Sequence, residues 1–163
     1  MIAQLIIRLH SIAGVPPTEQ RPDHACHQKV SDKMYNYFWT YFRLEDDDFE
    51  LPTDFREGID YLGDHDVYLP GTKGGVLWGA ESIIKHTQYW AAQDYYEGSS
   101  EREGWLCIGQ QGERSMAFLC CTPRSNYFGQ VLLGVSNSPW NDYSEMTLAA
   151  GSYEEYLQKC LTP

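Results

Sequence analysis

The last third of the chain contains three apolar runs of strand length: WLCIG (Trp105–Gly109), SMAFLCC (Ser115–Cys121) and QVLLGV (Gln130–Val135). The segments that separate them, QQGER and TPRSNYFG, carry the glycine, proline and asparagine residues that turns require. Apolar runs of this length joined by short turns are typical of neighbouring antiparallel strands. The stretch therefore predicts a β-meander.

The residues after the meander predict one further strand and a closing helix. MTLAA (Met146–Ala150) is a candidate fourth strand, and SYEEYLQKCL (Ser152–Leu161) follows it. Ser152, with Glu155 three residues later, fits a capping box, in which both side chains bind free N–H groups at the start of a helix. We expect this helix to pack under the meander, because its apolar residues repeat at helical spacing. They are Tyr153, Tyr156, Leu157, Cys160 and Leu161.

Upstream of the meander, the apolar spacing predicts four helices and two short strands. The helices are Ile2–Ala13, about His27–Phe42, Leu51–Leu62 and Glu81–Tyr95, and the strands are Val67–Leu69 and Val76–Trp78. Helices that precede an antiparallel sheet are typical of the α+β class. A chain of 163 residues can bury about 70% of its unfolded surface in one core. We expect a single α+β domain over residues 1–163, with N-terminal helices packed on an antiparallel β-meander that a C-terminal helix closes.

The second predicted helix is rich in aromatic residues. Its spacing places one set of large side chains on a single face: Val30, Met34, Tyr37, Phe38, Tyr41 and Phe42. The whole chain has 12 Tyr, 5 Trp and 6 Phe. Because Tyr and Trp are favoured at binding interfaces, we expect some of these rings to lie at the surface.

Two short motifs, placed on either side of the meander strands, resemble one protein family. LPTDFREGIDYLG (Leu51–Gly63) resembles a helix that begins L-P-x-[DS]-[FY], and AGSYEEYL (Ala150–Leu157) resembles an A-x-S-[FY]-x-x-[FY]-L helix. In this order they resemble the SUKH superfamily, of Smi/Knr type. The chain departs from the family where Asn-Gly-Gly usually ends the first helix, since Gly63-Asp64-His65 stands there. The resemblance covers 51–161 and leaves 1–25 as an N-terminal helical extension.

The resemblance implies a function as well as a fold. SUKH proteins are small α+β proteins, mostly immunity proteins of bacterial polymorphic toxin systems. They neutralise toxins that competing cells deliver on contact. A regulatory or scaffolding relative, which binds several partners weakly, is an alternative that the resemblance also leaves open.

The charge of the chain limits its partners. The net charge is −11, and one segment holds ten acidic residues against the single base Arg56. A field of this sign repels nucleic acid and anionic membranes, and it attracts basic proteins. The alternative is a solvated acidic face that keeps the protein in solution. The ten acids are Glu45, Asp46, Asp47, Asp48, Glu50, Asp54, Glu57, Asp60, Asp64 and Asp66.

The cysteines and the N-terminus indicate a cytoplasmic protein. Five cysteines form no disulfide framework, and Cys107, Cys120, Cys121 and Cys160 lie in apolar patterns, so we expect free thiols. Arg8 and His10 interrupt the first apolar stretch, which argues against a signal peptide. No run approaches the 18 apolar residues of a membrane span.

Candidate chemical motifs are weak. Asp23–His27 (DHACH) groups His and Cys side chains that ligate zinc, but no second ligand pair lies nearby, so a polar linker is the plainer interpretation and metal binding there stays open. Gly63–Asp66 (GDHD) and Pro70–Gly75 are interpreted as an acidic loop and a hairpin turn. Nothing in the sequence brings Cys120 and His86 together for nucleophilic catalysis. We expect no cofactor, no metal and no enzymatic activity; a small metal-dependent hydrolase using His65, Asp66 or His24 and Cys26 is the alternative.

Aromatic anchors among acids suit a basic protein partner, since buried rings supply affinity and charges supply speed. We expect an immunity protein that occludes a cognate toxin domain, basic and directed at nucleic acid. The protein itself should bind neither nucleic acid nor membrane, and be a monomer or weak dimer. The expected contact residues are Glu45, Asp46, Asp47, Asp48, Asp64, Asp66, Tyr68, Trp78 and Trp140.

Overall fold

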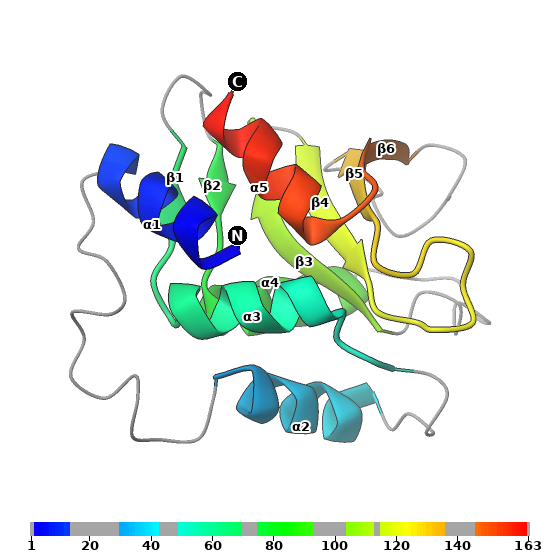
Figure 1. The fold of residues 1–163 in the computed structure, drawn as a ribbon. Coiled ribbons are helices and arrows are strands. Elements are labelled where there is room, and N and C mark those ends of the chain that lie inside the picture. Colours follow the sequence, from blue (N-terminus) through cyan, green and yellow to red (C-terminus); the bar gives the residue numbers. More distant parts are fainter. Residues whose placement is uncertain are drawn as a thin grey trace.

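The structure is a computed structural model, and it describes residues 2–13, 30–42, 49–69, 75–92, 104–112, 115–135 and 146–162. Within these ranges it contains five helices and six strands (Figure 1). The helices are α1 (Ile2–Ala13), α2 (Val30–Phe42), α3 (Thr53–Leu62), α4 (Ala80–Ala92) and α5 (Tyr153–Leu161). The strands are β1 (Val67–Tyr68), β2 (Val76–Leu77), β3 (Trp105–Gln110), β4 (Ser115–Cys120), β5 (Val131–Val135) and β6 (Thr147–Ala150).

The six strands form one sheet in the order of the sequence. Each strand pairs with the next in antiparallel register, as in a meander. Sequential antiparallel neighbours need only short connections, which is why the turn-rich segments of the last third could be read as hairpins. The α+β class and the antiparallel meander are confirmed, and the candidate fourth strand of the last third is β6.

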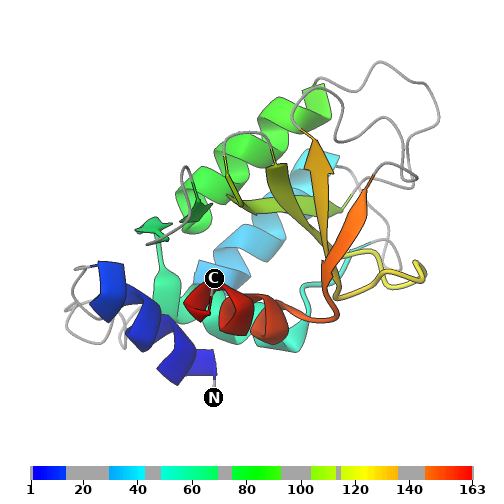
Figure 2. The same ribbon diagram turned by 90° about the horizontal axis from the view of Figure 1, so that it is seen from above.

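Helices cover the two faces of the sheet unequally. Viewed from above, α1, α3 and α5 lie on one side of the sheet, whereas α4 packs along β3 on the other side (Figure 2). Helix α2 lies across one end of the molecule, where it contacts both α3 and α4 (Figure 1). Helix α1 packs on α3 and α5 and adds Ile2, Leu5, Ile6 and Leu9 to the same hydrophobic core.

Both outer strands of the sheet have a neighbour that limits pairing with another chain. Helix α1 contacts β1 at one edge. At the other edge, Lys159 of α5 donates a hydrogen bond from Nζ to the carbonyl oxygen of Ala149 in β6, at 2.6 Å. A helix over one edge and a lysine on the other are both common ways to keep edge strands from aggregating.

The closing helix forms with the predicted cap. Ser152 Oγ accepts a hydrogen bond from the N–H of Glu155 at 3.1 Å. In return, the Glu155 carboxylate accepts one from the N–H of Gly151 at 2.8 Å, one residue earlier than the usual capping box. This hydrogen bond and Lys159 lower the pKa of Glu155. Among the predicted apolar positions, Tyr153, Tyr156 and Leu157 are buried, while Cys160 and Leu161 are half-buried.

A glycine lets α3 and α5 approach closely. A Cβ atom on Gly58 would lie 2.6 Å from Cε1 of Tyr153, a distance that real Cβ contacts do not reach. The Tyr153 ring meets Phe55 edge to face, with centroids 5.0 Å apart. Glycine is unfavourable inside a helix, by about 1 kcal/mol relative to alanine. Packing against Tyr153 is the physical reason that α3 carries one.

The sequence interpretation assigned too many aromatic residues to the inner face of α2. Met34 and Phe38 are buried, but Tyr41 is 41% exposed and Tyr37 only half-buried. Tyr37 and Tyr41 lie at the margin of the stripe that the helix turns toward the core. Residues of similar hydrophobicity cannot be separated into stripe and margin by spacing alone.

The thiols of the described cysteines are free. Cys107, Cys120 and Cys121 are buried and Cys160 is half-buried; Cys26 lies outside the described residues. Burial raises the pKa of the Cys107 and Cys121 thiols well above the usual value and that of Cys160 to about 12. A thiolate is the reactive form of cysteine, so these groups are poor nucleophiles where they lie.

Gly58→Ala tests the contact between α3 and α5. The new methyl group overlaps the Tyr153 ring, and overpacking of this kind costs about 1–3 kcal/mol, more than alanine gains in helix propensity. We expect a lower free energy of unfolding in urea titrations. In a Tyr153→Leu background the same substitution should cost much less, because the ring is gone. An equal cost in both backgrounds would contradict the proposed contact.

Candidate functional site

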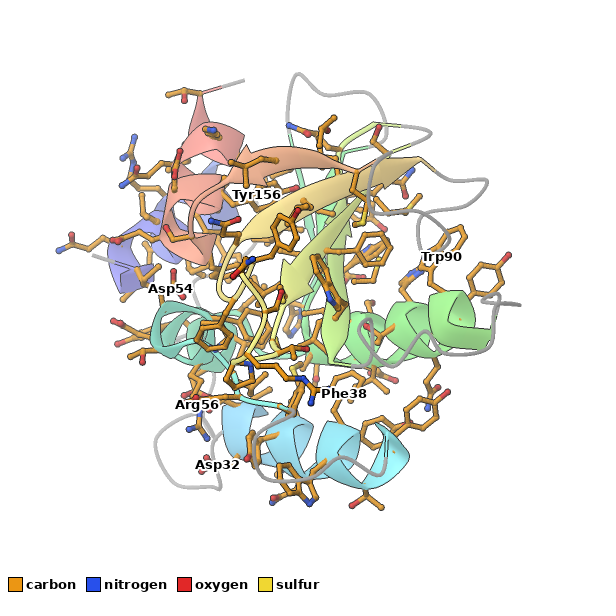
Figure 3. All side chains as sticks on the ribbon, turned by 90° about the vertical axis from the view of Figure 1, so that its right-hand side faces the viewer. Asp32, Phe38, Asp54, Arg56, Trp90 and Tyr156 are labelled. Atoms are coloured by element: carbon orange, nitrogen blue, oxygen red, sulfur yellow. The ribbon has the colours of Figure 1, made fainter. Side chains whose placement is uncertain are left out.

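Two carboxylates of the acidic segment bind the N-terminal ends of helices other than their own. Asp60 of α3 accepts hydrogen bonds from the N–H and the Oγ of Ser31, at 2.9 and 3.1 Å, in the first turn of α2. Asp54 accepts one from the N–H of Phe55 at 2.8 Å and, with its other oxygen, one from the N–H of Glu154 at 3.0 Å in α5. Figure 3 shows where Asp54 lies. Free N–H groups and the helix dipole make such ends favourable for anions.

The carboxylate of Asp66 binds the N-terminal end of α4 in the same way. It accepts hydrogen bonds from the N–H of Gly79 and the Oγ of Ser82, both at 2.9 Å. The N–H of Ala80 also donates to the carbonyl oxygen of Gly63, at 2.7 Å. These three bonds tie residues 63–66 to the start of α4. We call residues 63–68 together with 78–86 the β1–α4 corner.

The β1–α4 corner holds four of the residues expected to contact a partner. Asp64 is exposed, and Tyr68 is 73% exposed on β1. Asp66 is half-buried and already bound to α4, so it adds charge but has little free bonding capacity for a partner. In a strand the side chains alternate, which puts Val67 in the core and Tyr68 in solvent.

The assignment of Trp78 as a surface anchor is corrected by its burial. Its side chain is 5% exposed, and its ring lies parallel to the imidazole of His86 with centroids 3.7 Å apart. The residue follows β2 directly, and its apolar ring fills the space between the sheet and α4. Trp140 and the run Glu45–Asp48 lie outside the described residues.

The pKa of the His86 imidazole lies below its usual value. Burial lowers its pKa, the neighbouring Lys85 lowers it further, and Asp66 acts in the opposite direction. The imidazole, stacked on Trp78, belongs to the packing of α4 on the sheet. His65, in contrast, is exposed at the surface of the corner.

The weak chemical motifs gain no support from the structure. In the part of the chain that is described, no group of three or more His, Cys, Asp or Glu side chains is placed to hold a metal ion. Asp23–His27 and most of the Pro70–Gly75 loop lie outside that part. Across the same residues, no helix has both the length and the apolar character needed to cross a membrane.

Helix α2 carries aromatic rings on both flanks of its buried stripe, and the sequence interpretation did not single out two of them, Tyr35 and Trp39. Tyr35 and Trp39 stack at 5.7 Å on one flank of the buried stripe, and Tyr37 and Tyr41 stack at 6.0 Å on the other. The signal was present in YNYFWTYF, residues 35–42, where six of eight residues are aromatic. A surface helix buries about one stripe, so rings in such a density must also line its flanks.

Comparison with known proteins returned no match: no family profile, no curated protein and no solved structure resembles the chain at a significant level. The site is therefore described from its own geometry.

Asp60→Ala tests the role of the acidic segment in holding helices together. Ser31 is buried, and its donors would lose their partner, so we expect the free energy of unfolding to fall by about 1–3 kcal/mol. Glu57→Ala, an exposed acid on the same helix, is the matched control and should change stability by no more than about 0.5 kcal/mol. Equal effects of the two substitutions would argue against the cap.

The lowered pKa of His86 predicts a loss of stability in acid. The unfolded chain binds a proton near pH 6.5, whereas the folded chain resists it. Stability is therefore complete above that pH and falls as the pH drops through the folded pKa. His86→Phe keeps a ring on Trp78, and should reduce the decline in the free energy of unfolding between about pH 7 and pH 5. A decline equal in the wild type and in His86→Phe would exclude His86 as its source.

Proposed function

We propose that this chain is an immunity-type protein of the SUKH kind, which binds a basic toxin domain and blocks it by occlusion. The order of elements supports the proposal, because the α3 helix, the antiparallel meander and the closing α5 helix follow one another as the resemblance implies. The two motifs that carry the resemblance also pack on each other, through Asp54, Phe55 and Gly58 on one side and Tyr153 and Glu154 on the other.

The observation that carries the proposal is the β1–α4 corner. It presents a tyrosine ring that is 73% exposed, with an exposed carboxylate four residues before it. Tyrosine is enriched among the residues that dominate binding energy at protein interfaces. The hydrogen bonds of Asp66 and Ala80 hold the corner in place before a partner arrives. A preorganised surface loses less entropy on binding.

The charge of the chain favours a basic partner. Three acids of the acidic segment are bound to helix ends, and the exposed ones among the described residues are Glu50, Glu57 and Asp64. With a net charge of −11, their field speeds the approach of a cationic protein. Exposed carboxylates can stand where the phosphates of a nucleic-acid substrate would lie. The acids Glu45–Asp48 and Trp140 remain part of this proposal as predicted contacts.

Tyr68→Ala tests the proposal in binding measurements with the cognate basic toxin domain that the proposal requires. If Tyr68 is an anchor, its loss should weaken binding by about 2 kcal/mol, roughly 30-fold, mainly through faster dissociation. Asp64→Asn should instead slow association at low salt, with a smaller effect at high salt. Kinetics by surface plasmon resonance would separate the two effects.

The control for Tyr68 is Tyr89→Ala, at a tyrosine 54% exposed on α4, which should leave the dissociation rate unchanged. Co-expression should also restore growth to cells that produce the toxin domain. A toxin domain that neither binds the protein nor is neutralised by it would rule out the immunity role.

A further inference from the structure

One face of α2 combines a carboxylate with two stacked rings. Asp32, Tyr35 and Trp39 are spaced by three and four residues, so they share a face of the helix. All three side chains are partly exposed. Tyr35 lies between α2 and the rest of the protein, with Trp39 stacked at 5.7 Å and Phe49 tilted against it at 5.5 Å. We call Asp32, Tyr35 and Trp39, together with Arg56 of α3, the α2 aromatic patch.

The α2 aromatic patch already binds one arginine of the chain itself. The guanidinium of Arg56 forms an ion pair with Asp32 at 3.0 Å, and its central carbon lies 5.6 Å from the centre of the Tyr35 ring. Figure 3 shows Asp32 and Arg56 facing each other from α2 and α3. Both side chains remain substantially exposed, at 41% for Arg56 and 45% for Asp32. An arginine is thus held here by a carboxylate and an aromatic face at the surface.

We propose that the α2 aromatic patch is an arginine-binding surface, where Trp39 takes the guanidinium of an arginine from a basic protein partner. Trp39 offers the same chemistry as Tyr35 one turn further along the helix, and tryptophan is the strongest cation–π acceptor among the side chains. Asp32 lies two turns from Trp39 and is paired with Arg56, so the attraction for a second cation comes from the acidic field of α2 and α3 as a whole. The inference rests on the proposed function for the identity of the partner, a basic protein.

Charge and composition fit this occupant. The exposed or partly exposed acids on α2, on α3 and directly before it, namely Asp32, Glu50, Asp54, Glu57 and Asp60, outnumber the bases Lys33 and Arg56. Tryptophan, tyrosine and arginine are the residues most enriched in interface hot spots. A guanidinium is planar and stacks on aromatic rings, whereas an ammonium is compact and strongly hydrated. The patch should therefore distinguish arginine from lysine, which a merely acidic surface would not do.

The test compares octa-arginine with octa-lysine as probes in isothermal titration calorimetry at constant salt. The two peptides carry the same charge, so the acidic field acts on both alike. The wild-type protein should bind octa-arginine about two- to fivefold more tightly than octa-lysine, the range expected of one exposed cation–π contact. Trp39→Leu should lower the octa-arginine affinity to the octa-lysine value and leave the latter unchanged. In NMR spectra, the indole N–H signal of Trp39 should shift with octa-arginine.

Two further variants keep the test decisive. Trp39→Phe retains a ring, and should keep part of the preference even if the leucine variant folds poorly. Tyr127→Leu, at a tyrosine 41% exposed in the turn between β4 and β5, should keep all of it. A wild-type protein without preference for arginine, or a preference that survives Trp39→Leu, would overturn the inference.

The toxin domain then separates this inference from the proposed function. If the toxin binds and Trp39→Leu leaves its affinity unchanged, the immunity role stands and the patch is not part of its interface. If no toxin binds but the arginine preference depends on Trp39, the patch stands and the immunity role fails.

Discussion

The contact between α3 and α5 is the constraint on which the rest of the fold depends. Asp54 uses one carboxylate oxygen at the start of its own helix and the other on the N–H of Glu154, at the start of α5. A turn further along α3, the absence of a side chain at Gly58 admits the Tyr153 ring. A charge-assisted hydrogen bond between residues 100 positions apart and a close packing contact thus fix α5 on α3. The closing helix α5 can cover the sheet because it packs against α3.

An aspartate bound to the start of another helix recurs along the acidic segment. Asp54, Asp60 and Asp66 follow one another at intervals of six residues, and each carboxylate binds a different helix, namely α5, α2 and α4. An anion at a helix N-terminus satisfies N–H groups that have no partner inside the helix. Part of the charge of the segment therefore stabilises the tertiary structure. Among the described acids of the segment, those that a partner can meet most freely are the exposed Asp64, Glu57 and Glu50.

Two surfaces on different elements offer aromatic rings beside carboxylates. The β1–α4 corner presents Tyr68 with Asp64, and the α2 aromatic patch presents Trp39 with Asp32. In both, an aspartate that accepts hydrogen bonds from the start of a helix holds the surface together. Asp66 ties the residues next to β1, which carries Tyr68, to the start of α4, and Asp60 ties α2, which carries Trp39, to α3. Rigid aromatic side chains in an acidic field are the combination expected of a surface that recognises a basic protein. The acids that hold the fold together also position the rings that are proposed to bind.

Local sequence patterns determined most of the secondary structure of this protein. The spans of the strands and helices, the antiparallel order of the meander and the cap at Ser152 follow from turn residues, apolar spacing and a short capping signal, all of which act within a few residues. The exposure of Tyr68 follows from strand alternation beside a buried Val67. Only the tertiary structure decided which acids are free, because an aspartate that caps a distant helix looks the same in sequence as one in solvent. It also decided that Trp78 is buried against His86 and that Gly58 faces Tyr153. These contacts join residues that are distant in sequence or lie on different elements, and neither spacing nor composition carries information about which side chains will meet.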